Sequence, residues 1–455
     1  MSENTKMILA SFALGGAIFL SIHIFGQLLH IQDSEVRLTS LGVPKIIPLD
    51  ESKGEQKVIL NDPSIQKNWG LMGTDGASDI KASRAWDITQ GDRRIIVAVI
   101  DTGADVDHPD LSENIWHNPG ESGKDANGHD KATNGIDDDN NGYIDDVAGW
   151  DFVNNRPDVV DNHGHGTHIA GIIGAVGGNG IGISGVCPKV SLMILKYFDP
   201  KSKGNDNLKN TVRAIRYAVD MGANVINYSG GGTDPNDDEF AAIKYAQDKG
   251  VLVVAAAGNE HSNSDVAHYY PADYNLSNII SVTAIDTFAK VLRSSNYGTK
   301  TVHIAAPGEG IYSTLPGGNY GLMTGTSQAT AFVSGVAALI LSHNKDFSAD
   351  QVKKQIIATA DELPGLRDKT VSGGKLNSYA ALAIQPSIPA TGIASARGNV
   401  STGVIGSNSG DKGTRSLSGS DGGEGSVDLT SLIKAINRPV AGVPGPASTN
   451  DKSSN

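Results

Sequence analysis

The sequence has only one cysteine, Cys187, among its 455 residues. One cysteine cannot form an intrachain disulfide, and neither a zinc site built from thiolates nor a CxxC redox pair is available. The 55 glycines show no period of three, which excludes a collagen-like chain. A chain of this length can bury a substantial core, so its stability need not depend on sulfur.

Basic residues are fewer than acidic ones. Lys and Arg total 37 against 50 Asp and Glu, which gives a formal net charge of −13. A surface that binds nucleic acid needs many cationic contacts with phosphate, so we expect no nucleic-acid partner. A metal cation fits this excess of carboxylates better.

Residues 7–26 lack formal charge, except for a possible one on His23. A helix of this length crosses about 30 Å of hydrocarbon. Lys6 precedes the segment and acidic residues follow it, a bias that places the amino terminus inside and the remainder outside. We expect an exported protein whose residues 1–32 are a membrane anchor, or a cleaved signal peptide of a secreted or periplasmic protein; a buried helix is the alternative.

The rest of the chain divides by composition. Residues 33–61 show no sustained period and are expected to be a spacer, whereas residues 386–455 are rich in Gly, Ser, Thr and Asn and are expected to be disordered. Between them, residues 62–385 alternate short apolar runs with helical stretches, which predicts an α/β domain with a mostly parallel sheet covered by helices. The runs are residues 93–101, 190–198, 223–230, 251–259, 279–286 and 301–308.

Polar residues end several of these runs, where functional groups of open parallel sheets gather. Asp101, Asn227 with Ser229, and Asn259 come from three different runs. Ser327 opens a further apolar helix, where unpaired backbone N–H groups would stabilise an oxyanion. A serine before a helix is equally well explained as an N-cap, and Asp101 as the cap of a turn.

A serine hydroxyl needs a base before it can act as a nucleophile, and a neutral imidazole has a suitable pKa. His165 is our candidate base, with Asp101 holding its far nitrogen. His163 and His168 lie close to it in sequence. His165 and His168 could instead share a zinc ion on one helical face, although the HExxH spacing is absent.

Four sequence blocks resemble the signatures of the subtilisin-like serine proteases, the subtilases: VIDTGADVDHPDL, HGHGTHIAGIIGA, AAAGN and GTSQATAFVSG. The chain order Asp, His, Ser matches that of subtilisin. The resemblance covers roughly residues 62–383. It implies a subtilisin-like fold with helices on both faces of the sheet, and a serine endopeptidase in which Asp101, His165 and Ser327 form the catalytic triad. Asn259 is similar to the asparagine of the oxyanion hole.

The resemblance also implies how substrate binds. An extended peptide or unfolded protein would add as a strand between two edges of the chain. Glycines at these edges are expected to leave roomy pockets, so we expect broad specificity with a preference for large apolar groups, and a monomeric enzyme. The two edges are Ser229, Gly230, Gly231 and Ala256, Ala257, Gly258.

The sequence departs from the family at three points. Gln328 stands where the family usually has Met after the nucleophile, and Ala331 where it usually has Pro. Subtilases often carry a folding prodomain of roughly 70–80 residues, but only about 35 separate the apolar segment from the expected domain. Neither substitution removes a catalytic atom, whereas the short spacer implies unassisted folding or a different role for the spacer.

An acidic segment predicts a calcium site. Residues 125–161 contain ten aspartates and two basic residues, a density that repels itself unless cations neutralise it. Asp137, Asp139, Asn141 and Asp145 follow the first nine positions of an EF-hand loop, with Gly142 at the turn. The Glu of position twelve is missing, so another residue must close the shell, with Asp146 and Asp151 as candidates. A solvated acidic loop is the alternative.

A second calcium site would resemble one common in the family and would use Asp110 and Asn179. Cys187 is expected to be a buried spectator thiol. Two other classes compete with the protease: a non-catalytic calcium-binding surface protein that kept the fold, and a nucleotide-binding doubly wound domain. The second needs a GxGxxG after the first strand, which is absent.

Overall fold

The computed structural model describes residues 60–73, 78–200 and 207–384. The expected membrane segment at residues 7–26 and the tail from residue 386 lie outside these ranges, as does nearly all of the expected spacer. Within the described ranges, no helix combines the length and the apolar character needed to span a bilayer.

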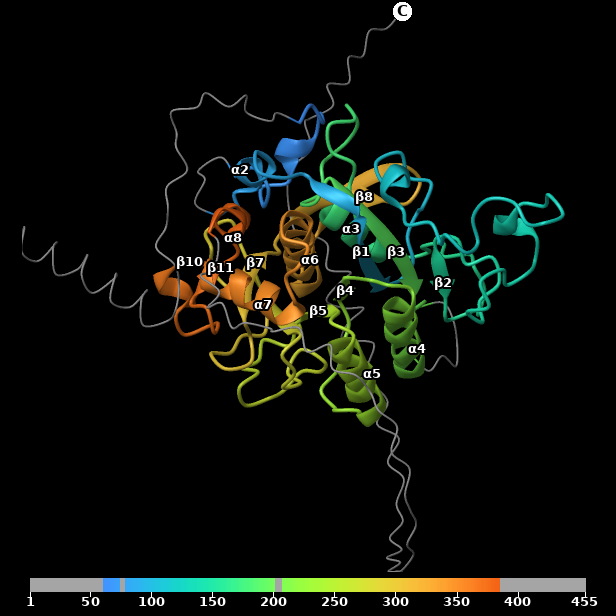
Figure 1. Cartoon of the computed structure of the whole chain (residues 1–455). Helices are drawn as coiled ribbons and strands as arrows, with labels where there is room; N and C mark the ends of the chain where they lie inside the picture. Colours follow the sequence, from blue (N-terminus) through green and yellow to red (C-terminus); the bar gives the residue numbers. More distant parts are fainter. Residues whose placement is uncertain (1–59, 74–77, 201–206, 385–455) are drawn as a thin grey trace, which may run out of the picture. The chain divides into compact units, whose positions relative to one another are not determined.

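A nine-stranded sheet organises the described residues (Figure 1), in the order β10-β11-β7-β6-β5-β4-β1-β3-β2. All neighbouring pairs are parallel except β10 with β11, and a separate antiparallel hairpin joins β8 to β9. The strands are β1 (Gly91–Asp101), β2 (Gly149–Asp151), β3 (Lys189–Lys196), β4 (Val225–Tyr228), β5 (Leu252–Ala256), β6 (Ile279–Ile285), β7 (Ile304–Pro307), β8 (Ile311–Leu315), β9 (Asn319–Met323), β10 (Asp361–Glu362) and β11 (Gly374–Lys375).

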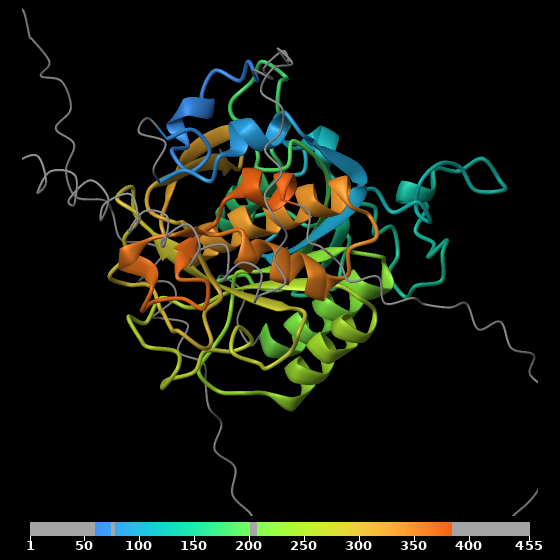
Figure 2. The same ribbon diagram turned by 60° about the vertical axis from the view of Figure 1, so that its left-hand side comes forward.

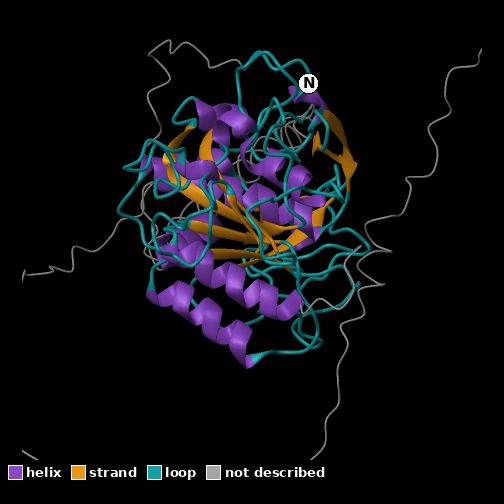
Figure 3. Ribbon diagram, turned by 90° about the vertical axis from the view of Figure 1, so that its right-hand side faces the viewer, coloured by secondary structure: helices purple, strands orange, loops and turns teal. Residues whose placement is uncertain are grey.

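Helices cover both faces of the sheet (Figure 3), and α4 and α5 pack together on one of them (Figure 2). The α-helices are α2 (Ala82–Trp86), α3 (His165–Gly174), α4 (Asn207–Asp220), α5 (Asp237–Asp248), α6 (Thr326–His343), α7 (Ala349–Ala358) and α8 (Ser378–Ala383). Short 3₁₀ turns are η1 (Ile65–Lys67), η2 (Ser112–Asn114), η3 (Lys131–Thr133) and η4 (Pro364–Leu366). The α/β architecture expected from the sequence is confirmed.

Strand β1 shows why its residues form a central strand. Val97 and Val99 pack into the core under α3 and α6, while Ala98 and Ile100 pack into the core under α4 and α5. A parallel strand that is apolar on both faces belongs in the middle of a covered sheet. The six apolar runs predicted as strands are β1, β3, β4, β5, β6 and β7, whereas β2, β8, β9, β10 and β11 were not predicted.

The register of the parallel strands brings their carboxyl ends together. Ile100 is opposite Tyr228, and Tyr228 is opposite Ala255. Asp101 therefore ends β1 beside the segments that follow β4 and β5. At this edge the β4–β1–β3 order places later strands on both sides of β1, which is the position where open α/β sheets form their binding crevice.

Candidate active site

Strand β1 and helix α3 bring an aspartate and a histidine into contact. Asp101 is the last residue of β1, and His165 is the first residue of α3. Their side chains meet at 2.7 Å between His165 Nδ1 and Asp101 Oδ1, and both residues are buried. A carboxylate can only accept, so Nδ1 carries the hydrogen, which leaves Nε2 of a neutral ring free to accept a proton.

The charge state of His165 is set by opposing effects. Burial disfavours its protonated form, but the charge and hydrogen bond of Asp101, together with the charge of Asp161, outweigh burial and raise the pKa of His165. An imidazole whose protonated form is stabilised in this way can act as a general base toward a hydroxyl.

The candidate nucleophile lies in the first turn of α6. Ser327 is the second residue of this helix and is 7% exposed. Gly325 occupies the N-cap position and no side chain makes a capping bond there, so the N-cap explanation for Ser327 does not hold. The Ser327 hydroxyl donates to the Ser229 carbonyl at 3.2 Å. Its backbone N–H is among the unpaired donors at the start of the helix.

Asn259 follows β5 and is held by the residue before Ser327. Its Oδ1 accepts from the Thr326 N–H at 3.1 Å and from the Thr326 hydroxyl at 3.3 Å. Because the side-chain oxygen is engaged, the amide nitrogen faces the other way and remains a donor.

One cavity collects these four side chains. It is lined by Asp101, Thr102, His163, His165, Tyr197, Phe198, Ser229, Asn259 and Ser327. A base paired with a carboxylate, a hydroxyl at a helix start and an amide donor are the parts needed for acyl transfer through a covalent intermediate. The family model described as "Subtilase family" matches residues 92–381, which include all four.

The chain belongs to the subtilase family. Thermitase from Thermoactinomyces vulgaris is 37% identical over 307 residues, covering 68% of this chain and 95% of thermitase. A thermophilic serine proteinase from Bacillus sp. (strain AK1) is 35% identical, covering 68% of this chain and 66% of that protein. A solved protease from Pseudoalteromonas arctica PAMC 21717 superimposes with a TM-score of 0.57 at 26% identity, covering 72% of this chain and 99% of that one. This subtilase is a serine-type endopeptidase.

The two segments expected to bind substrate each adjoin a cavity residue of this subtilase: Ser229 lines the cavity itself, and Gly258 directly precedes Asn259, which also lines it. We call them the β4 edge (Ser229, Gly230, Gly231) and the β5 edge (Ala256, Ala257, Gly258); each continues the strand after which it is named. The β4 edge ends where Gly232 and Tyr270 exchange two backbone hydrogen bonds.

The expectation that glycines leave roomy pockets at the β4 edge is wrong. A Cβ on Gly230 would lie 2.3 Å from the Tyr197 hydroxyl oxygen, and one on Gly231 would lie 2.4 Å from Tyr269 Cε1. These glycines are required because tyrosine rings pack directly on the backbone, so the walls of the site here are aromatic.

The shared zinc site considered for His165 and His168 does not form. His168 is fully buried, and its Nε2 lies 3.0 Å from the Ile311 carbonyl and 3.2 Å from the Gly321 carbonyl. Carbonyls only accept, so Nε2 carries a hydrogen and is not available to a metal. Nδ1 is buried without a hydrogen-bond partner, but no group of metal-ligating side chains among the described residues includes either histidine. Burial, with the charge of His165, lowers the pKa of His168 to about 3. His168 is a structural residue.

The acidic segment emerges as an arm beside β2 (Figure 1, teal), and its carboxylates come together at one point. Ligand oxygens of Glu121, Asp137 and Asp139 lie within 4.8 Å of one another. Glu121 is fully buried, burial raises its pKa, and its Oε2 has no hydrogen-bond partner. A buried carboxylate oxygen without a donor is costly unless a cation neutralises it, so this group fits a hard cation such as Ca²⁺.

The expected calcium ligands fare differently. Asn141 lies beside the group but turns its amide nitrogen toward it: Nδ2 donates to Asp139 Oδ2 at 3.3 Å and to Asp146 Oδ2 at 2.9 Å, while its Oδ1 accepts from the Tyr143 N–H at 2.7 Å. Asp145 does not belong to the group: its backbone has φ 55°, and its Oδ1 accepts from the Gly135 N–H. Neither residue considered for closing the shell leaves an oxygen free. Asp146 accepts from Asn118, Asn141 and Tyr217, and Asp151 accepts from Val153 and Asn154.

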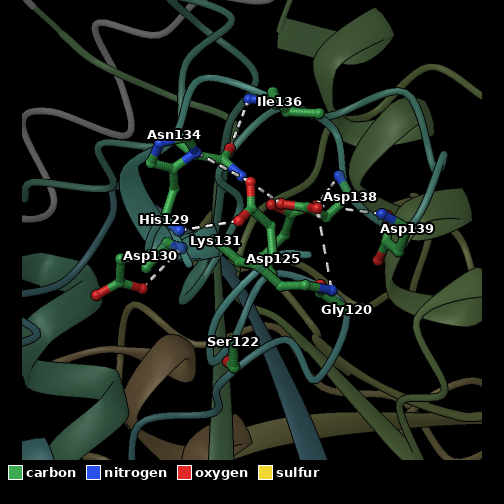
Figure 4. Close-up of polar contacts among 12 residues, drawn as sticks. Gly120, Ser122, Asp125, His129, Asp130, Lys131, Asn134, Ile136, Asp138 and Asp139 are labelled. Carbon is green, nitrogen blue, oxygen red and sulfur yellow. Dashed lines mark hydrogen bonds and ion pairs between the residues drawn. The ribbon is translucent and has the colours of Figure 1, made fainter. Parts of the chain in front are cut away.

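The one lysine of the arm, Lys131, interacts with Asp138 and with the backbone beside Glu121. Lys131 Nζ donates to the Gly120 carbonyl at 3.1 Å and lies 4.0 Å from Asp138 (Figure 4). Asp138 also accepts from Asn134. Asp138 is therefore partnered by protein groups. Glu121 Oε1 also has donors, since it accepts from the Asp138 N–H at 2.7 Å and the Asp139 N–H at 3.4 Å, so Glu121 Oε2 is the buried oxygen that lacks one.

Asp110 and Asn179, expected at a second calcium site, are in contact. Asn179 Nδ2 donates to Asp110 Oδ1 at 2.8 Å, and Asp62 accepts from the backbone of residues 178–180. Asp110 Oδ2 accepts from Ile183 and Tyr320. All four carboxylate oxygens of Asp62 and Asp110 thus have donors, and burial, chiefly, raises the pKa of both residues.

Five residues were not singled out by the sequence analysis: Glu121 at the carboxylate group, Asp161 before α3, and Thr102, Tyr197 and Phe198 in the lining of the cavity. Glu121 lies sixteen positions before Asp137, where the EF-hand pattern begins, which is too far for a loop pattern to include it. Tyr197 and Asp161 had weak signals: an aromatic just after a strand, and an aspartate four residues before His165.

Proposed function

We propose that Asp101, His165 and Ser327 form the catalytic triad of this endopeptidase. In this mechanism the Ser327 hydroxyl attacks the scissile carbonyl while His165 Nε2 takes its proton. The Ser327–carbon bond forms, the peptide C–N bond breaks, and His165 returns the proton to the leaving amine. Water then hydrolyses the acyl-enzyme by the same route. The observation that carries the proposal is the 2.7 Å contact of His165 with Asp101 in a cavity that Ser327 and Asn259 also line.

Asn259 is proposed to stabilise the oxyanion that forms in each step. Its amide nitrogen is free because Thr326 engages the side-chain oxygen. The backbone N–H of Ser327, at the start of α6, supplies the second donor. Two oriented donors in a buried site stabilise the developing charge without reorganisation.

Chemical labelling tests the triad against a non-catalytic binding protein of the same fold. Phenylmethylsulfonyl fluoride forms a covalent adduct with an activated serine, so we expect intact-mass and peptide analysis to place one adduct on Ser327. Hydrolysis of casein should be lost in step with labelling. A protein that remains unlabelled in calcium buffer would support the binding protein instead.

Substrate is proposed to bind as an extended strand between the β4 and β5 edges. The aromatic side chains of Tyr197 and Phe198 line the cavity next to these edges. Such walls favour large apolar substrate side chains near the scissile bond and do not select for particular polar groups. This supports broad specificity toward peptides and unfolded proteins.

Calcium is proposed to bind the group formed by Glu121, Asp137 and Asp139, with Asn141 next to it. The buried, unpartnered Oε2 of Glu121 supports this ligand set. Bound calcium would offset the repulsion between these carboxylates and so stabilise the arm. A second site at Asp110 and Asn179 stays a weaker proposal, because it has no buried carboxylate oxygen that lacks a donor, as Glu121 Oε2 does.

Replacing Glu121 with Gln should separate two effects of calcium. At free calcium about 100 times Kd, bound ion adds about 2.7 kcal/mol to the free energy of unfolding, or on the order of 5 °C in Tm. We expect the Tm of the wild type to fall by this increment when EGTA removes calcium. The Tm of the variant should differ little between calcium and EGTA. In EGTA the variant should be the more stable protein, because it no longer buries a charged carboxylate one of whose oxygens has no donor.

Scanning calorimetry with and without EGTA measures both Tm values. Glu113→Gln is the matched control, since Glu113 is a surface carboxylate paired with Arg93; it should behave as wild type. A calcium increment of the same size in Glu121→Gln and wild type would show that Glu121 is not a ligand.

Peroxide resistance is expected from the residue after the nucleophile. Gln328 is 1% exposed in the first turn of α6 and carries no thioether. Oxidation of a methionine at this position would add a polar oxygen beside Ser327. We expect Gln328→Met to lose activity several-fold faster than wild type in dilute peroxide. Equal rates of inactivation in the two proteins would contradict this.

The cellular setting is proposed from residues 1–32 alone. We propose an exported, monomeric enzyme whose catalytic domain at residues 62–385 is held outside the membrane by residues 7–26, or released if that segment is cleaved. Mass spectrometry of the mature amino terminus from cells distinguishes the anchor from the signal peptide.

A further inference from the structure

A second buried carboxylate lies behind the Asp101–His165 pair. Asp161 precedes α3, is 5% exposed, and uses both of its oxygens. Oδ1 accepts from the Thr102 hydroxyl at 2.9 Å and from the N–H groups of His163 and Gly164 at 2.9 and 2.8 Å. Oδ2 accepts from the Thr167 N–H at 2.9 Å and the Thr167 hydroxyl at 2.7 Å. One side chain therefore holds the loop after β1 and the first turn of α3.

Thr102 connects this carboxylate to the catalytic pair. Its backbone N–H donates to Asp101 Oδ1 at 2.8 Å, the same oxygen that His165 contacts. Its hydroxyl accepts from the Gly166 N–H at 2.9 Å while donating to Asp161. The two segments approach closely here, since a Cβ on Gly166 would lie 2.0 Å from the Gly103 carbonyl oxygen. A small shift of α3 would therefore move His165 relative to Asp101.

Charged groups around His165 also affect its protonation. Burial opposes protonation of His165, Asp101 on β1 favours it most, and Asp161 also favours it by its charge. Two further imidazoles lie near this ring: His163 from the segment before α3, with ring centroids 6.4 Å apart, and His168 from α3 itself. Burial mainly, and then the charge of His165, lowers the pKa of both. Asp161 is the only carboxylate among these neighbours apart from Asp101.

We propose that Asp161 is a positioning residue for proton transfer, holding α3 and the β1 loop in the register where His165 and Asp101 meet. The inference rests on the triad proposed above. Asp161 touches neither substrate nor reacting atoms; it acts through Thr102 and through the backbone of the first turn of α3. A helix-capping role alone would explain the bonds to Gly164 and Thr167, but not the bond to Thr102.

The test compares five variants with wild type in peptide p-nitroanilide hydrolysis as a function of pH. Asp161→Asn removes the charge and two acceptor positions, and Thr102→Val removes the connecting hydroxyl. Displacement of a catalytic group by about 1 Å costs roughly 10²-fold. We expect Asp161→Asn to lower kcat by about that factor with KM within about twofold. The acid limb of its pH profile should move to lower pH, since His165 loses a nearby anion.

Two variants serve as controls for this loss. Thr102→Val should lose part of the same activity, and Thr102→Ser, which keeps the hydroxyl, should regain most of it. Asp158→Asn removes an exposed carboxylate from the same segment, paired with Arg156, and should match wild type.

The outcomes are distinct. A lower Tm with kcat and the acid limb unchanged in Asp161→Asn would reduce Asp161 to a helix cap and overturn the proposal. If Asp161→Asn does not fold, Thr102→Val decides, and unchanged kcat there overturns it equally. Ser327→Ala in the same assay tests the proposed triad separately. Activity in Ser327→Ala would refute the triad. If Ser327→Ala is inactive while Asp161→Asn has wild-type kcat and acid limb, only the positioning role of Asp161 is refuted.

Discussion

Ser327→Ala should lower kcat by about 10⁶-fold, a magnitude taken from subtilisin, a member of the same family. The substitution removes the hydroxyl that forms the acyl-enzyme, and the remaining donors of the site give only residual catalysis. Because Ser327 is 7% exposed and its hydroxyl makes one hydrogen bond, to the Ser229 carbonyl, the fold should survive. Peptide p-nitroanilide hydrolysis and circular dichroism measure the two effects.

Ser342→Ala is the matched control for this loss. Ser342 lies on the same helix, and its hydroxyl donates to the Ala338 carbonyl within α6. This variant should keep wild-type activity. If Ser327→Ala retained more than about 1% of wild-type kcat with correct folding, the nucleophile would have to be another group.

Asn259→Ala should lower kcat by about 10²–10³-fold with little change in KM, again a range known from subtilisin. The reason is that its amide nitrogen is proposed to donate only to the oxyanion, a charge absent from bound substrate. Steady-state kinetics on one peptide substrate provide both constants.

The isosteric Asn259→Asp separates this role from structural support. An aspartate can still accept from the Thr326 N–H, which Asn259 contacts at 3.1 Å, but it has no amide to donate. We expect Asp at this position to be as damaging as Ala. An Asp variant with near wild-type kcat would mean that the contact with Thr326, rather than the donor, explains the loss in Asn259→Ala.

Local sequence patterns predicted the central strands and the polar residues at their ends. β1 could be read from residues 93–101 because it is apolar on both faces, as buried parallel strands are. The two-residue strands β10 and β11 could not be read, because a pattern needs more positions than they have. The hairpin of β8 and β9 was also missed; its partly exposed second strand has no apolar alternation.

Three expectations from local patterns were wrong or incomplete because they depended on the three-dimensional arrangement of the chain. Gly230 and Gly231 suggested open pockets, but Tyr197 and Tyr269 arrive from other segments and fill the space. In the acidic arm the EF-hand spacing pointed to Asp145, yet a positive φ turns that side chain toward Gly135. Glu121 joins the carboxylate group from outside the loop altogether.

The sequence by itself determined the fold class, the family and the four residues proposed to carry the chemistry, because each depends on residue order within a short stretch: strand periodicity, a helix start, a motif. Only the tertiary structure decided which side chains surround them. The packing of Tyr197 on Gly230, the burial of Glu121 Oε2 without a donor, and the hydrogen bonds that tie Asp161 to Thr102 all join residues remote in sequence. Such contacts arise when strands and helices pack, and no local pattern records them.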